Sequence, residues 1–141
     1  MSSEIPKWFV PVGVVALLWN LLGCAAYLAD VMLTPEDIAQ MTAAQQAAYA
    51  ARPGWAVAAT AIAVWAGAAG SLGLILRKAW AVPLLVVSLI GVIAQDLGLF
   101  VLTDSGQQAG TMAFVLQGLV LMVAICLVLL GKRAKAAGWF R

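Results

Sequence analysis

Residues 80–101, WAVPLLVVSLIGVIAQDLGLFV, form a long apolar stretch that carries Gln95 and Asp96 near one end. As an α-helix this stretch extends about 33 Å, enough to cross the roughly 30 Å hydrocarbon core of a bilayer. Similar apolar stretches cover about residues 8–28, 55–76 and 111–130. The pattern predicts an all-α membrane protein, a bundle of four transmembrane helices that forms a single domain over residues 1–141.

The composition favours the same class. The chain has 141 residues, of which 65% are hydrophobic and 10% charged, and its mean hydropathy is +1.02. Soluble domains contain about 25% charged residues. The first stretch is longer than the apolar core of a signal peptide, so we expect it to stay in the mature protein. We expect the bilayer as a partner, with a homo-oligomer or a larger membrane complex, and no nucleic acid.

The basic residues predict the orientation of the bundle. With four spans, one side receives Lys7, Arg77, Lys78, Lys132, Arg133, Lys135 and Arg141. The other side receives Arg52 together with Asp30, Glu36, Asp37 and Asp104. Because basic residues concentrate in cytoplasmic loops, we predict that both termini and the 77–79 loop are cytoplasmic.

The connection at residues 29–54 is too long for a simple turn and lies on the predicted outer side. Thr34 is a candidate N-cap and Pro35 suits the first helical position, which predicts a helix from about residue 35 to Tyr49. Pro53-Gly54 ends it. Two interpretations are open. The helix lies on the membrane surface through a weak apolar face, or it is a solvated spacer.

Four polar residues fall inside the predicted spans: Asn20, Gln95, Asp96 and Gln117. Counted from the cytoplasmic side, Asn20 lies about 18 Å deep, Gln117 about 20 Å and Asp96 about 24 Å. Similar depths predict one buried polar cluster. It is either a binding or proton-handling site, or a set of interhelical hydrogen bonds worth about 0.6 kcal/mol each. A third interpretation places an ionised Asp96 in a water-filled funnel.

Two tryptophans, Trp19 and Trp65, are predicted near mid-membrane, although tryptophan usually lies at the interfaces. They either adjoin a small hydrophobic ligand or, as we prefer, fill space against small residues. The second span supplies such residues at four-residue spacing: Ala59, Ala63, Gly67 and Ser71. This spacing permits close helix approach and predicts that the second span is the central packing helix or an oligomer contact.

No pattern for metal, cofactor or covalent chemistry stands out. The chain has no histidine, and its two cysteines, Cys24 and Cys126, lie in separate apolar stretches. We therefore predict no metal, no cofactor and no enzymatic activity, and we interpret both cysteines as small core residues. The tail KRAKAAGWFR combines basic and aromatic residues, which predicts that it rests on anionic lipid headgroups.

Three segments carry a resemblance to a known family. They are Trp19-Asn20 with Gly23, then AYAARPGWAVAATAIAV, then GSLGLILRKAWAVPLLVVSLIGVIAQ, and the likeness is strongest from Tyr49 to Gln95. The chain resembles a family of small bacterial four-helix membrane proteins that often carry the label "sugar transporter". The resemblance implies a four-span protein of the bacterial inner membrane. In size and layout the chain is also similar to DoxX-like four-helix proteins.

Three functions are open at this point. The first is a non-enzymatic accessory or structural subunit that packs against partner membrane proteins or itself. The second is an oligomeric transporter of a small molecule, or a proton-coupled one, with a polar site around Asp96. The third is a membrane redox partner that binds a quinone or a lipid.

Overall fold

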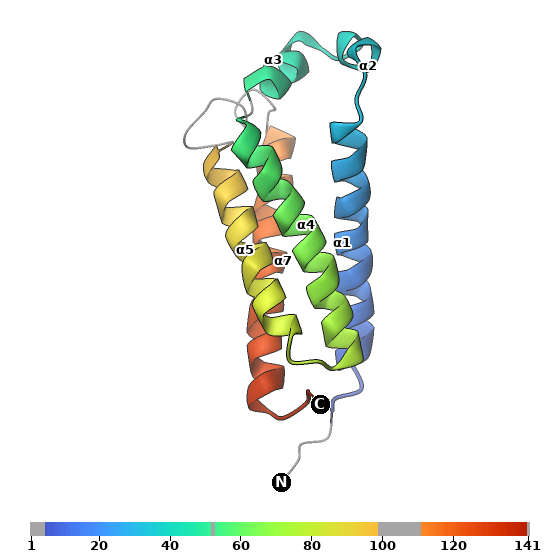
Figure 1. Cartoon of the computed structure of the whole chain (residues 1–141), viewed down its shortest axis with the longest axis vertical. Helices are drawn as coiled ribbons and strands as arrows, with labels where there is room; N and C mark the ends of the chain where they lie inside the picture. Colours follow the sequence, from blue (N-terminus) through green and yellow to red (C-terminus); the bar gives the residue numbers. More distant parts are fainter. Residues whose placement is uncertain (1–4, 52, 99–110, 141) are drawn as a thin grey trace.

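The computed structural model describes residues 5–51, 53–98 and 111–140, and within these ranges the secondary structure is helical, without strands. Four helices run side by side and antiparallel: α1 (Phe9–Val31), α4 (Gly54–Leu76), α5 (Ala81–Asp96) and α7 (Thr111–Ala136). Figure 1 shows both chain termini and the α4–α5 turn at one end of this bundle, here called the terminal end. The short helices α2 (Pro35–Ala39) and α3 (Ala43–Ala51) lie across the opposite end.

Three of these helices are long and apolar enough to cross a membrane: Phe9–Val31, Gly54–Leu76 and Phe114–Ala136. α5 is also apolar and has 16 residues, and residues 99–101 of the predicted third span lie outside the described ranges. Large apolar side chains cover the outside of the bundle, and Leu22 is 67% exposed. A helical bundle with such a surface is typical of a membrane protein.

The last helix is longer than predicted. It continues through Gly131 to Ala136, whereas the sequence suggested an end near Leu130. Gly131 faces α5, where a Cβ would lie 3.4 Å from Leu85 and Val82 atoms, so it is a packing position and not a helix end. Arg133 and Lys135 occupy the last turn, where positive charge interacts favourably with the helix dipole.

α4 is the central helix of the bundle and packs against both α1 and α5. All four small residues of its predicted ladder are buried. The approach to α5 is very close, because a Cβ on Gly91 would lie 2.8 Å from the Ala59 carbonyl oxygen and 2.9 Å from the Ala63 nitrogen. The prediction that the second span is the central packing helix agrees with this arrangement.

An aromatic cluster joins α1 to the chain end that follows α7. It consists of Trp8, Phe9, Trp139 and Phe140; the Phe9 and Trp139 ring centroids are 5.2 Å apart. Gly138, at φ +77°, turns the chain so that Trp139 reaches the bundle. Trp139 is only 5% exposed, so the prediction that the whole tail rests on headgroups is wrong for this residue. Its ring packs on Phe9 within the apolar core, and its Nε1–H is buried there without a hydrogen-bond partner among the described residues.

The connection between α1 and α4 holds two short helices where the sequence predicted one. Thr34 caps α2: its hydroxyl accepts from Asp37 N, and its own N–H donates to the Asp37 carboxylate at 3.0 Å. This backbone hydrogen bond, with that from the Thr34 side chain, lowers the pKa of Asp37. Thr42 and Gln45 repeat the arrangement, with bonds of 3.0 and 3.1 Å. This second capping box starts a new helix and breaks the predicted one.

Candidate functional site

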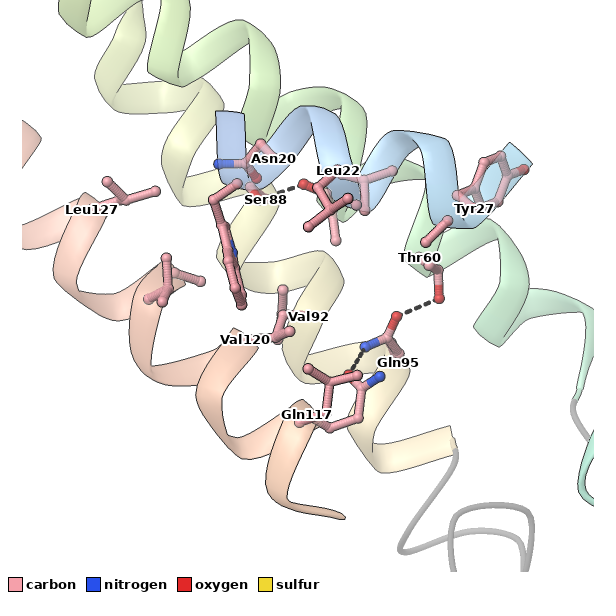
Figure 2. Close-up of a pocket in the computed structure, with 18 of the residues that line it drawn as sticks. Asn20, Leu22, Tyr27, Thr60, Ser88, Val92, Gln95, Gln117, Val120 and Leu127 are labelled. Atoms are coloured by element: carbon pink, nitrogen blue, oxygen red, sulfur yellow. Dashed lines mark hydrogen bonds between the residues drawn. The ribbon is translucent and has the colours of Figure 1, made fainter. Parts of the chain in front are cut away.

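A cavity of about 440 Å³ lies among α1, α4, α5 and α7 (Figure 2), and most of its lining belongs to the half of the bundle away from the terminal end. The extensive helix contacts run from α1 to α4, from α4 to α5 and from α5 to α7, which leaves α1 and α7 as the two edges of the arrangement. The aromatic cluster joins these edges at the terminal end. Farther along the bundle the cavity occupies the space between them.

The cavity opens sideways between α1 and α7. Leu22 on α1 and Leu116 on α7 both line it, and they are 67% and 49% exposed. Most of the other lining side chains are apolar, among them Val64, Val92 and Leu127. Tyr27 and Asp30 line it near the end of α1. A mostly apolar cavity with a few placed polar groups is the usual form of a small-molecule site.

Three polar side chains from three helices form a hydrogen-bonded chain beside the cavity, here called the Gln95 group. The Thr60 hydroxyl on α4 donates to the Gln95 side-chain carbonyl on α5. Gln95 Nε2 then donates to Gln117 Oε1 on α7 at 2.5 Å, and Figure 2 shows both bonds. Gln95 is only 5% exposed, so these partners offset the cost of removing its amide from water.

The direction of these hydrogen bonds leaves the amide nitrogen of Gln117, at one end of the Gln95 group, as a donor without an acceptor among the described residues. The Gln95 side-chain oxygen accepts a hydrogen bond from Thr60, and Gln95 Nε2 donates to Gln117 and, at 3.5 Å, to Asp96 Oδ1. Gln117 uses its oxygen as an acceptor. In the described part of the chain, no atom accepts a hydrogen bond from Gln117 Nε2, so this group offers two N–H donors.

A second polar set, here called the Asn20 group, lies nearer the middle of the bundle and contains Asn20, Ser71 and Ser88. Asn20 Nδ2 donates to Ala16 O at 2.9 Å and to Ser71 Oγ at 3.2 Å. Ser88 donates to the Ala63 carbonyl at 2.6 Å. Gly67 makes room for both, because a Cβ there would collide with Asn20 Oδ1 and lie 3.0 Å from Ser88 Oγ.

The structure therefore divides the single polar cluster that the sequence predicted. Gln95 and Gln117 are in contact, whereas Asn20 bonds within its own group. Asp96 touches Gln95 but faces a shallow groove between α5 and α7 that it shares with Gln117, on the other side from the cavity. Helix rotation explains the split, since Asp96 is turned about 100° from Gln95.

The two mid-membrane tryptophans have different surroundings. Trp19 is partly buried and lines the cavity. Trp65 is 48% exposed on the outside of α4, so the interpretation that it fills space within the bundle is wrong. The cysteines also differ. Cys24 is buried and its thiol donates to the Val64 carbonyl at 3.4 Å, but Cys126 is exposed and not a core residue.

Sequence reasoning did not single out Thr60 or Ser88, although both contribute to the polar groups. One signal was present: Ser88 and Gln95 are seven residues apart and so share a helix face, with Gly91 between them. Thr60 carried a weaker signal, because a threonine in a helix can bond to its own backbone; here its one hydroxyl hydrogen is shared between Ala56 O, at 3.0 Å, and Gln95.

Comparison with known proteins found no family model, no curated protein and no solved structure that matches this chain. Among the described residues, no group of three or more His, Cys, Asp or Glu side chains is placed to hold a metal ion. The site is therefore interpreted from its own geometry.

Proposed function

We propose that this protein binds one lipid-like molecule in the cavity between α1 and α7, as a non-enzymatic, four-span protein of the bacterial inner membrane. The observation that carries the proposal is a mostly apolar cavity of about 440 Å³ whose rim residues, Leu22 and Leu116, are themselves exposed on the apolar outside of the bundle. A molecule dissolved in the bilayer reaches such a site without crossing water. Of the three functions that the sequence left open, lipid binding fits this geometry best.

The proposed orientation has both termini in the cytoplasm. Lys7, Lys78 and Arg133 mark the terminal end of the bundle, and α2 and α3 with Glu36 and Asp37 lie at the other. The positive-inside rule then places the cavity in the outer half of the membrane. Reporter fusions near Gln45 and after Arg141 test this. We expect an outside signal at the first and an inside signal at the second, and the reverse would overturn the orientation.

Native mass spectrometry of the detergent-extracted protein tests lipid binding. We expect the wild-type chain to retain one lipid. Val120 lines the cavity, so Val120→Phe fills part of it and should remove the retained lipid. Val115→Phe is the matched control, because Val115 lies on the same helix and is 63% exposed. Equal lipid retention by both variants, or none by the wild type, would contradict the proposal.

A second candidate is the accessory subunit. The groove between α5 and α7 supports it, since Asp96 and Gln117 lie there among Ile93, Leu97 and Phe114, and Gly118 leaves open space for a neighbouring helix. Purification from native membranes tests this role. A stoichiometric larger partner that is lost with Gly118→Leu supports it, and a wild-type protein that purifies without such a partner argues against it.

A further inference from the structure

We propose that the cavity selects single-chain lipids whose head is uncharged and carries an acceptor oxygen, such as an ester or ketone carbonyl, and that Gln117 Nε2 binds this oxygen. This inference rests on the proposed lipid-binding function and names the class of ligand. It follows from the direction of the hydrogen bonds in the Gln95 group, the charge of the lining and the size of the cavity.

The hydrogen bonds determine which atoms of Gln117, which lines both the cavity and the groove, are available to a ligand. Thr60 donates to Gln95, Gln95 donates to Gln117 Oε1, and Asp96 Oδ1 accepts from the same Gln95 nitrogen. Both acceptors, Gln117 Oε1 at 2.5 Å and Asp96 Oδ1 at 3.5 Å, lie on the nitrogen side of the Gln95 amide and so orient it. Gln117 is then held with its oxygen occupied and its nitrogen unused. A ligand is bound best at this point by an acceptor.

The lining excludes an anionic head. Asp30 is the one charged residue among the described residues that line the cavity, and it is an acid. The described lining residues offer a carboxylate or phosphate no cation to pair with, and burying such a charge in an apolar site is very costly. A neutral carbonyl oxygen needs only a donor, and Gln117 supplies one. Burying that oxygen without a partner is costly, so the pairing discriminates between lipids.

The size and position of the cavity favour one chain. About 440 Å³ is near the lower end of the range for small-molecule sites. Gln117 lies on α7 nearer the outer end, while Leu85 and Leu127 line the cavity closer to the terminal end. A head bound at Gln117 therefore directs its chain inward along apolar side chains, past the Asn20 group, with Leu22 and Leu116 at the side opening.

Three brominated C18 probes that differ only in the head test this inference: methyl 9,10-dibromostearate, 9,10-dibromostearate and 9,10-dibromooctadecane. Bromine quenches tryptophan on contact, and Trp19 lines the cavity. The Trp19 signal is the quenching lost in Trp19→Phe, with Trp65→Phe as control because Trp65 is 48% exposed on the outside. We expect the ester to half-quench Trp19 at a concentration about three- to tenfold below that of the alkane or the carboxylate.

Two variants assign the preference to Gln117. Gln117→Leu removes the donor, and Gln117→Glu keeps the acceptor for Gln95 while removing the free N–H groups. Both should quench equally with ester and alkane, and two variants keep the test valid if one fails to fold. Equal quenching of wild-type Trp19 by ester and alkane, or tighter binding of the carboxylate, would overturn the inference and leave lipid binding intact. No quenching of Trp19 by any probe would overturn both.

Discussion

The two ends of the bundle differ in how α1 and α7 are joined. At the terminal end, Phe9 and Trp139 are 0% and 5% exposed and close the space between α1 and α7. At the other end the same two helices are separated by a cavity whose rim is exposed. The polar side chains of the spans lie at the middle and at the open end, and the aromatic cluster lies at the closed one.

The difference between the closed and the open end shows where this bundle has room for a ligand. Large rings fill the closed end, where ring contacts and not hydrogen bonds join α1 to the residues that follow α7. At the open end, the Gln95 group holds α4, α5 and α7 together by hydrogen bonds while α1 remains an edge. Such bonds contribute only about 0.6 kcal/mol each in membranes, and the site is stabilised mainly by the closely packed α4–α5 pair.

The largest expected effect comes from opening the closed end. Trp139→Ala removes the ring that contacts Trp8 and Phe9, and it should lower the free energy of unfolding by about 3–5 kcal/mol. Trp65→Ala is the control, since Trp65 is 48% exposed and should cost far less. Unfolding in mixed micelles with increasing SDS measures both. Equal losses would mean that the aromatic cluster does not close the bundle.

A smaller effect is expected where α4 and α5 meet. Gly91→Ala places a Cβ 2.8 Å from the Ala59 carbonyl oxygen and should lower the free energy of unfolding by about 1–3 kcal/mol. Gly118→Ala is the matched control on α7, because nothing lies within 4 Å of its Cβ and alanine favours the helix by up to about 1 kcal/mol. The same SDS titration measures the free energy of unfolding of both variants. A Gly91→Ala protein as stable as wild type would show that this contact is loose.

The Asn20 group should contribute less again. Asn20→Ala removes two donated hydrogen bonds, to Ala16 O and Ser71 Oγ, and we expect a loss of about 0.6–1.7 kcal/mol. Cys126→Ala, at an exposed position on α7, is the control and should change stability little. A loss as large as that of Trp139→Ala would mean that the polar groups, and not the aromatic cluster, hold the bundle together.

The smallest effect concerns pH at α2. The pKa of Asp37 is lowered by hydrogen bonds from Thr34, so its capping contribution is present above the ordinary aspartate pKa and is lost as pH falls through the lowered value. Amide exchange of α2 should therefore speed up only in strongly acidic solution, with rates corrected for the intrinsic effect of pH. Asp37→Asn should remove this pH dependence, and a variant that keeps it would assign the titration to another group.

Much of the fold was accessible from the sequence, because apolar length and small-residue spacing are local signals. The three long helices, the shorter apolar helix α5 and the burial of Ala59, Ala63, Gly67 and Ser71 follow from those signals. The break between α2 and α3 was also readable, since Thr42 and Gln45 repeat the capping pattern of Thr34 and Asp37. The sequence-based prediction used the Thr34 N-cap alone and therefore gave one helix.

Only part of the site could be predicted from the sequence. Counting residues gives the depth of a side chain along its helix, but not the direction in which it points around the helix axis. Counting residues along each helix brought Gln95 and Gln117 to similar depth, and they do bond. It could not show that Asp96 turns to another groove or that Asn20 finds Ser71 first. The seal at Trp139 depends on a turn at Gly138, with φ +77°, and on contact with Phe9 at the far end of the chain. No local pattern encodes that long-range contact.

The most direct test of the account compares Trp19 and Trp139 in bilayers of phospholipid brominated in the acyl chains, near the headgroup in one set and near the chain end in another. The account predicts that Trp19→Phe lowers the quenched fraction of fluorescence, because chains enter beside Trp19 at the open end. It predicts that Trp139→Phe raises this fraction, because Trp139 is protected. Trp19 as well protected as Trp139 at every bromine depth would contradict the claim that the half of the bundle away from the terminal end is open to lipid.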